Sequence, residues 1–174
     1  MERKKDIMKT HFRKIVVLFL LAPFSVLAQE FEVPDYKLKK AEDFEQYSED
    51  VLKGITWIKE TPINEQENKR KIVYGFLMEW MTGSPFVHIA VDQRIVTFMG
   101  GETPDLLMLF LAGWTEQELK SGKKDKFMGN LKGVEAVMDF YEKNKSVLPK
   151  DKNVEKYIKM RDKGTLEDFI KKNI

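Results

Sequence analysis

Apolar residues recur at steps of three and four along most of the chain, which is the spacing of one face of an α-helix. The first stripe begins after Ala41 and contains Phe44, Tyr47, Val51, Ile55 and Ile58. A second stripe consists of the pairs Ile72/Val73, Phe76/Leu77 and Trp80/Met81. Asn64, with Glu67 three residues later, is predicted to cap this second helix, and Gly83 and Pro85 are predicted to end it.

A buried helix is predicted at about 104–119. Thr103 and Pro104 are typical of a helix start, and the residues from Leu106 to Ala112 are apolar on every side. A helix without a polar face has no side to turn toward water, so we place it at the centre of the fold. Further stripes after residues 126, 152 and 165 predict the remaining helices.

These patterns predict an all-α fold, a bundle or small array of six to seven amphipathic helices around the buried helix. Short connections would make neighbouring helices antiparallel. Phe86 to Val91 is rich in β-branched residues and too short to show a helical period, so one short extended segment is allowed at 86–91. A short helix over 93–99 is expected to follow it.

A helical-repeat fold is the alternative. The stretch AVMDFYEKN resembles the second helix of a tetratricopeptide unit. The three tryptophans stand near predicted helix ends, but their unequal spacing argues against a true repeat. A repeat-type interaction module is therefore the second interpretation, after the bundle.

Residues 1–28 have the layout of a cleavable signal peptide. Basic residues precede an apolar run at 15–27 that is too short to span a bilayer, and cleavage is predicted between Ala28 and Gln29. Translation could equally begin at Met8. No cysteine follows the run, so the expected product is a periplasmic or secreted protein that is soluble, not a lipoprotein and without a membrane span. Residues 29–40 are read as a polar lead-in and 41–174 as a single helical domain.

Charge and cysteine content narrow the possible partners and chemistries. Removing the leader's six basic and two acidic residues from the totals of 30 and 28 leaves 24 and 26, a net charge of −2. Such a chain lacks the basic footprint of a nucleic-acid-binding protein. The absence of cysteine excludes thiol nucleophiles, Cys-ligated zinc, iron–sulfur clusters and a fold built on disulfides.

Candidate catalytic residues are few. His88 is the only histidine after the leader, and Ser84 lies four residues before it, but no G-x-S-x-G motif is present. His88 and Asp92 alone make no metal site. We therefore predict no catalytic residue, no metal and no cofactor. Paired carboxylates could hydrolyse glycosides, with Glu79 and Asp139 as the candidates, so a cell-envelope hydrolase stays open as an alternative.

Residues beside the apolar stripes could face a ligand. The candidates are Glu79, Trp80, His88 and Trp114. Gly129 and Gly133 are four residues apart on one predicted helix, which would let a second backbone approach closely and form a homo-oligomer. Asn144-Lys145-Ser146 is an N-glycosylation sequon.

Several stretches resemble small exported all-helical proteins of the Bacteroidota. They are EDVLKGITWIKETPINEQENKRK, EWMTGSP, PDLLMLFLAGWT and MGNLKGVEAVMDFYEKNKSVLPKDKNVEKYIKM. The resemblance covers most of the chain after the leader and implies export and a helical fold, without an activity. The favoured function is a non-enzymatic exported helical domain that binds a partner protein or a small ligand in the cell envelope.

Overall fold

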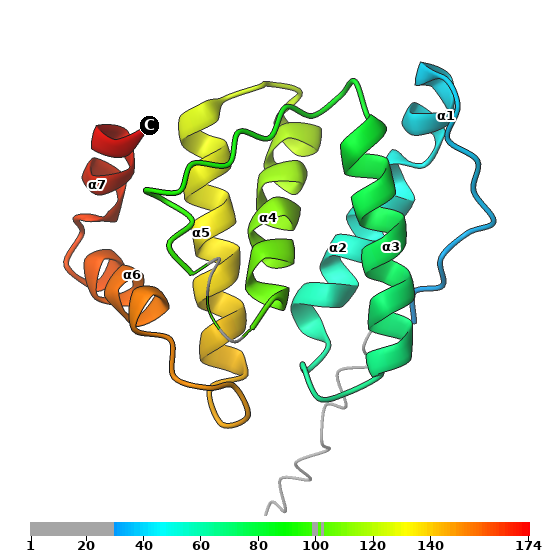
Figure 1. Cartoon of the computed structure of the whole chain (residues 1–174). Coiled ribbons are helices and arrows are strands. Elements are labelled where there is room, and N and C mark those ends of the chain that lie inside the picture. The colour runs from blue at the N-terminus through cyan, green and yellow to red at the C-terminus, as the bar shows by residue number, and fades with distance from the viewer. Residues whose placement is uncertain (1–29, 99–100, 102) are drawn as a thin grey trace, which may run out of the picture.

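The regular elements in the described part of the protein are all helices (Figure 1). The structure, a computed structural model, describes residues 30–98, 101 and 103–174. These residues contain seven helices and no strand, as the all-α prediction required. The helices are α1 (Ala41–Gln46), α2 (Ser48–Glu60), α3 (Glu67–Gly83), α4 (Asp105–Ser121), α5 (Lys126–Lys143), α6 (Lys152–Asp162) and α7 (Leu166–Asn173).

The helices α4 and α5 form an antiparallel pair in the middle of the fold (Figure 1). Gly122 ends α4 in the left-handed conformation, with φ 64°, and the side chain of Asp125 caps α5 by accepting a hydrogen bond from the Met128 amide at 3.0 Å. Most residues of α4 are buried, which confirms the buried helix predicted at about 104–119.

The pair α2 and α3 lies on one side of α4, and α6 and α7 lie beside α5 (Figure 1). Arg70 of α3 joins its own helix to α2. Its guanidinium donates hydrogen bonds to the carbonyl oxygens of Ile58, Thr61 and Pro62 at 3.2, 2.7 and 2.9 Å. Because a helix ends with unpaired carbonyls and a partial negative charge, a buried cation is stabilised there.

Three local predictions were wrong. The stripe predicted from Ala41 to Ile58 is divided between α1 and α2 at Tyr47, where the Ser48 hydroxyl donates to the Phe44 carbonyl at 3.2 Å and the helix bends. Asn64 does not cap α3. The residue at the cap position is Gln66, which adopts the left-handed conformation. Residues 93–98 form turns in place of a helix, and Met99 lies outside the described residues.

The connection between α3 and α4 is longer than the short loops that were expected. It crosses the ends of α4 and α5 before it returns to the start of α4 (Figure 1), and residues 86–91 form no strand. Val87, Ile95, Val96 and Phe98 are buried. The Tyr157 hydroxyl of α6 donates to the Ile95 carbonyl at 2.6 Å. Long-range contacts of this kind, which no local pattern reveals, hold the segment in place.

Residues 30–40 pack on the helices and are not merely a polar lead-in. The Phe31 ring is buried against Gly54, and the Tyr36 ring lies 4.9 Å from the Phe76 ring. The predicted leader and the cleavage point between Ala28 and Gln29 lie outside the described residues.

Candidate functional site

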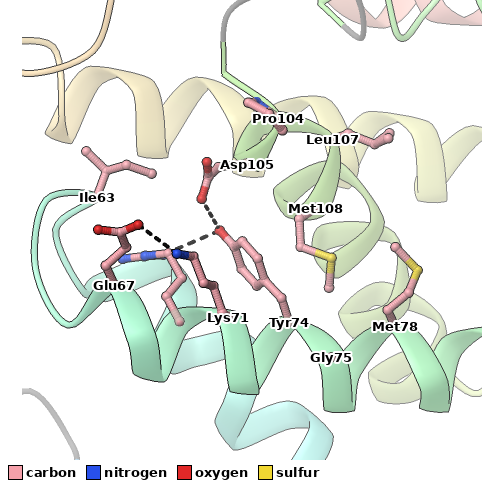
Figure 2. A pocket seen from close by; sticks show the side chains of 11 residues that line it. Ile63, Glu67, Lys71, Tyr74, Gly75, Met78, Pro104, Asp105, Leu107 and Met108 are labelled. Carbon is pink, nitrogen blue, oxygen red and sulfur yellow. Dashed lines mark hydrogen bonds and ion pairs between the residues drawn. The ribbon is translucent and has the colours of Figure 1, made fainter.

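A candidate binding site is a pocket between α3 and α4, here called the α3–α4 pocket (Figure 2). Its volume is about 660 Å³, inside the range of about 300–1,000 Å³ that is usual for small-molecule sites. Its apolar lining consists of Ile63, Gly75, Met78, Pro104, Leu107 and Met108. Methionine side chains are flexible and polarizable, so these walls can adapt to ligands of different shape.

Polar side chains gather at one end of the pocket. The Tyr74 hydroxyl donates to the Asp105 carboxylate at 2.8 Å, and Lys71 pairs with Glu67 at 2.8 Å. Figure 2 shows Tyr74 reaching from α3 toward Asp105 at the start of α4. Burial raises the pKa of Tyr74 strongly, and the negative charge of Asp105 raises it further. Tyr74 therefore stays neutral and keeps donating its proton to Asp105 across the physiological pH range.

Arg70 also lines the pocket, and its hydrogen-bonding capacity is not fully used. The residue is only 3% exposed, and three aromatic rings, those of Trp57, Tyr74 and Phe140, lie 5.6–5.9 Å from its guanidinium carbon. Its two terminal nitrogens bind the carbonyls at the end of α2, but Nε has no partner in the part of the chain that the structure describes. The second oxygen of Asp105 likewise accepts no hydrogen bond from the described residues.

This arrangement is suited to binding and poorly suited to catalysis. A carboxylic acid that donates a proton in hydrolysis needs a raised pKa. The hydrogen bond and charge of Lys71 lower the pKa of Glu67, which is the opposite direction. Tyr74, with its raised pKa, is not an effective base at neutral pH. What the pocket offers is an apolar cavity with one hydrogen-bond acceptor, the second Asp105 oxygen, at its end.

The four predicted ligand-facing residues are distributed over the fold. Glu79 is exposed on α3 and accepts a hydrogen bond from the Tyr36 hydroxyl at 2.8 Å, which anchors residues 30–40. Trp80 is fully buried, and its Nε1 donates to the Phe44 carbonyl at 2.8 Å. Only His88 and Trp114 share a hollow, of about 210 Å³, and neither lines the α3–α4 pocket.

Glu118 explains the surroundings of His88. Its carboxylate is 3% exposed and accepts hydrogen bonds from Trp114 Nε1 at 2.9 Å and from the His88 backbone N–H at 2.6 Å. The imidazole has no part in these bonds, and the residue is exposed. In sequence, Glu118 looks like one of two surface acids in WTEQEL. Its structural role depends on a segment 30 residues away.

The carboxylate pair of the hydrolase alternative is not brought together. Glu79 lines a hollow beside Phe44 and Thr82, whereas Asp139 of α5 lines a charged groove between Lys59 and Lys132. Asp139 is exposed, and its carboxylate lies 4.0 Å from the Arg161 guanidinium. Two acids in different hollows cannot act on one bond, so this pair supports no glycoside hydrolysis.

Gly129 and Gly133 serve contacts within the chain. A Cβ on Gly129 would overlap the Trp114 indole, and a Cβ on Gly133 would overlap the Phe110 ring. The close approach that the spacing predicts is therefore made by α4, and this face is not open to a second copy. Asn144 of the sequon is buried as well, and its side chain binds the Ile63 amide and the Phe140 carbonyl, both at 2.9 Å.

The sequence patterns did not single out Arg70, Tyr74 or Asp105. Asp105 is an acid in the first turn of α4, a common place for one, and Tyr74 lies 31 residues before it. The one signal was Gly75, an unusual residue in the middle of a helix. Between residues 30 and 174, as far as the structure describes them, no group of three acidic or histidine side chains could hold a metal ion. No helix there is long and apolar enough to cross a membrane.

No protein-family model, no curated protein and no solved structure matches the chain. The α3–α4 pocket must therefore be interpreted from its own geometry.

Proposed function

We propose that the protein is a non-enzymatic binding module whose ligand occupies the α3–α4 pocket. The observation that carries the proposal is the pocket itself: about 660 Å³, apolar walls, and at one end an Asp105 oxygen that accepts no hydrogen bond from the described residues. Ligand sites commonly combine an apolar lining with a few convergent polar groups.

The charges around the pocket favour a neutral ligand end. Lys71 pairs with Glu67, and Arg70 balances Asp105, so two acids and two bases leave no net charge. A ligand ammonium would be repelled by Arg70 and Lys71, and a ligand carboxylate would be repelled by Glu67 and Asp105. The preferred ligand is amphipathic, with an apolar body and an uncharged end that donates a hydrogen bond to Asp105.

We further propose that this binding takes place outside the cytoplasm. The support is the order of basic residues, apolar run and small residues within 1–28. N-terminal sequencing of the protein recovered from expressing cells, together with cell fractionation, tests it. A mature chain that begins at Gln29 in the exported fraction is expected, and an intact leader in the cytoplasmic fraction would refute it.

Occupation of the pocket can be measured with N-acetyl-leucinamide, a neutral probe with one apolar side chain. In ¹⁵N–¹H correlation spectra, its addition should shift the amides of Tyr74, Gly75, Asp105 and Met108 more than those of the rest of the chain. Leu107→Trp fills the pocket and should abolish these shifts. Leu111→Trp is the matched control, because Leu111 is a partly buried leucine one turn along the same helix that does not line the pocket. Equal shifts in both variants would contradict the proposal.

A further inference from the structure

We infer that Met78 is an oxidation-sensitive site in the wall of the α3–α4 pocket, and that conversion of its thioether to the sulfoxide by a peroxide weakens ligand binding there. The effect on binding rests on the proposed function, because it concerns the same pocket. Which methionine a peroxide oxidises first does not depend on any ligand and is measured separately.

Met78 differs from the other described methionines in its access to solvent. Its residue is 43% exposed. The five others within the described residues are buried or partly buried: Met81, Met108, Met128, Met138 and Met160. An oxidant must reach the sulfur atom to react with it, so exposure sets the order of oxidation. Met78 is therefore expected to react first among them.

The Met78 side chain forms part of the pocket wall. It lines the α3–α4 pocket, and it also lines a second hollow of about 500 Å³ beside Phe44 and Thr82. Figure 2 shows it standing out from α3 at the end of the pocket farthest from Glu67. A change at this sulfur alters a surface that a ligand would touch, and it leaves the buried core residues of α3 as they are.

The oxidation replaces an apolar group by a polar one. A sulfur lone pair attacks one oxygen of hydrogen peroxide, the O–O bond breaks, and the leaving hydroxide takes up the remaining proton. Sulfur loses two electrons, the peroxide gains two, and the products are a sulfoxide and water. An apolar ligand body that covers Met78 would remove the sulfoxide oxygen from water without offering it a hydrogen-bond donor, which is unfavourable. The change is reversible, because enzymes reduce methionine sulfoxide.

The first measurement is the order of oxidation. The full chain is treated with a limiting amount of hydrogen peroxide, and peptide mass spectrometry follows each methionine separately. Met78 should be half oxidised at least about fivefold sooner than Met81 or Met108. Equal rates at Met78 and at the buried Met108 would overturn the inference.

The second measurement is the affinity for N-acetyl-leucinamide before and after oxidation, from titration of the amide shifts. The affinity should fall about threefold or more. Met78→Leu keeps an apolar wall without a thioether, so its affinity should not change on peroxide treatment. If the sulfoxide form of the unchanged protein binds as well as the unoxidised form, the inference fails and the proposed function stands. If the unoxidised protein does not bind the probe, both fail.

Met78→Gln separates the polarity of the wall from oxidation elsewhere in the chain. Glutamine resembles the sulfoxide in length and polarity, so it should lower the affinity for N-acetyl-leucinamide without peroxide. Ile72→Gln is the matched control, since Ile72 is 62% exposed on α3 and lines neither hollow. The melting temperature of both variants should stay within about 2 °C of the unchanged protein, because both positions are exposed. If the two variants bind the probe equally well, polarity at residue 78 does not control binding and the inference is wrong.

Discussion

Two buried charges, Arg70 and Glu118, stand at the edges of two hollows, and their surroundings differ in one respect. Neither forms an ion pair with another described residue, and both are 3% exposed. Both oxygens of Glu118 are satisfied by N–H donors of the chain itself. Arg70 satisfies its terminal nitrogens but leaves Nε without a partner in the part of the chain described. Both charges hold the fold together, but Glu118 is fully hydrogen-bonded within the chain, whereas Arg70 keeps one buried N–H that no described residue accepts.

The largest expected effect is that of Arg70→Met. The change leaves the carbonyls of Ile58, Thr61 and Pro62 without their donor and removes a charge that three rings surround. We expect the free energy of unfolding to fall by about 3–5 kcal/mol in urea titrations. Arg70→Lys retains the charge but not the planar guanidinium, so its free energy of unfolding should lie between those of the unchanged protein and Arg70→Met. A loss below about 1 kcal/mol for Arg70→Met would mean that Arg70 does not hold α2 and α3 together.

Glu118→Ala should have the next largest effect. It leaves Trp114 Nε1 and the His88 amide without acceptors, and each buried unpaired group costs about 1–3 kcal/mol. We expect a loss of about 2–3 kcal/mol, with faster hydrogen exchange at the His88 amide. His88→Ala is the control, because its backbone N–H remains and stability should stay unchanged. If Glu118→Ala leaves the hydrogen-exchange rate of the His88 amide unchanged, the carboxylate does not hold the connection between α3 and α4 in place.

Two glycine-to-alanine substitutions should act in opposite directions. Gly129→Ala drives a Cβ into the Trp114 indole and should cost about 1–3 kcal/mol. Gly75→Ala meets open space and should raise the free energy of unfolding by about 0.5–1 kcal/mol. Thermal unfolding of the two variants side by side measures both. A destabilised Gly75→Ala would show that this glycine serves the fold after all.

Glu116 differs from Arg70 and Glu118 because it forms ion pairs, with Lys59 and Lys120. Burial alone would raise its pKa, but hydrogen bonds from Lys120 and from Lys59, the latter at 2.7 Å, outweigh burial and lower the pKa. A carboxyl group with a lowered pKa in the folded state stabilises the protein above its unfolded pKa, and the stabilisation is lost as the pH falls through its folded pKa. Glu116→Gln should therefore reduce the drop in stability below pH ~4.5 by about 1 kcal/mol or less. If urea titrations show the same loss of stability at acid pH in Glu116→Gln as in the unchanged protein, the prediction is wrong.

The helices could be predicted from sequence because their signals are local. Leu106 to Ala112 is apolar on every side, and the structure buries α4 between its neighbours. The course of residues 84–98 could not be predicted, since its anchors Glu118 and Tyr157 are distant in the chain and look like ordinary surface or core residues in sequence.

The α3–α4 pocket escaped prediction for a related reason. Trp80 and Trp114 drew attention because tryptophan is large and rare, but both are packed into the core. The pocket depends on what the apolar stripes of α3 and α4 leave unfilled, and a stripe predicts the contact between two helices without predicting its gaps. Only Gly75 marks the site in the sequence, by being a poor residue for its position.

The hydrogen bond from Tyr157 to Ile95 has a consequence for the order of folding. It joins residues 62 positions apart, and the Asn153 side chain adds a second bond from α6 to the Thr97 carbonyl at 2.9 Å. During synthesis, residues 84–98 reach the ribosome exit well before α6 exists. The part of this segment around Ile95 and Thr97 can be fixed only when nearly the whole chain has been made. A nascent chain that stops before Lys152 should therefore leave this segment open to proteases, while α2 and α3 are already paired.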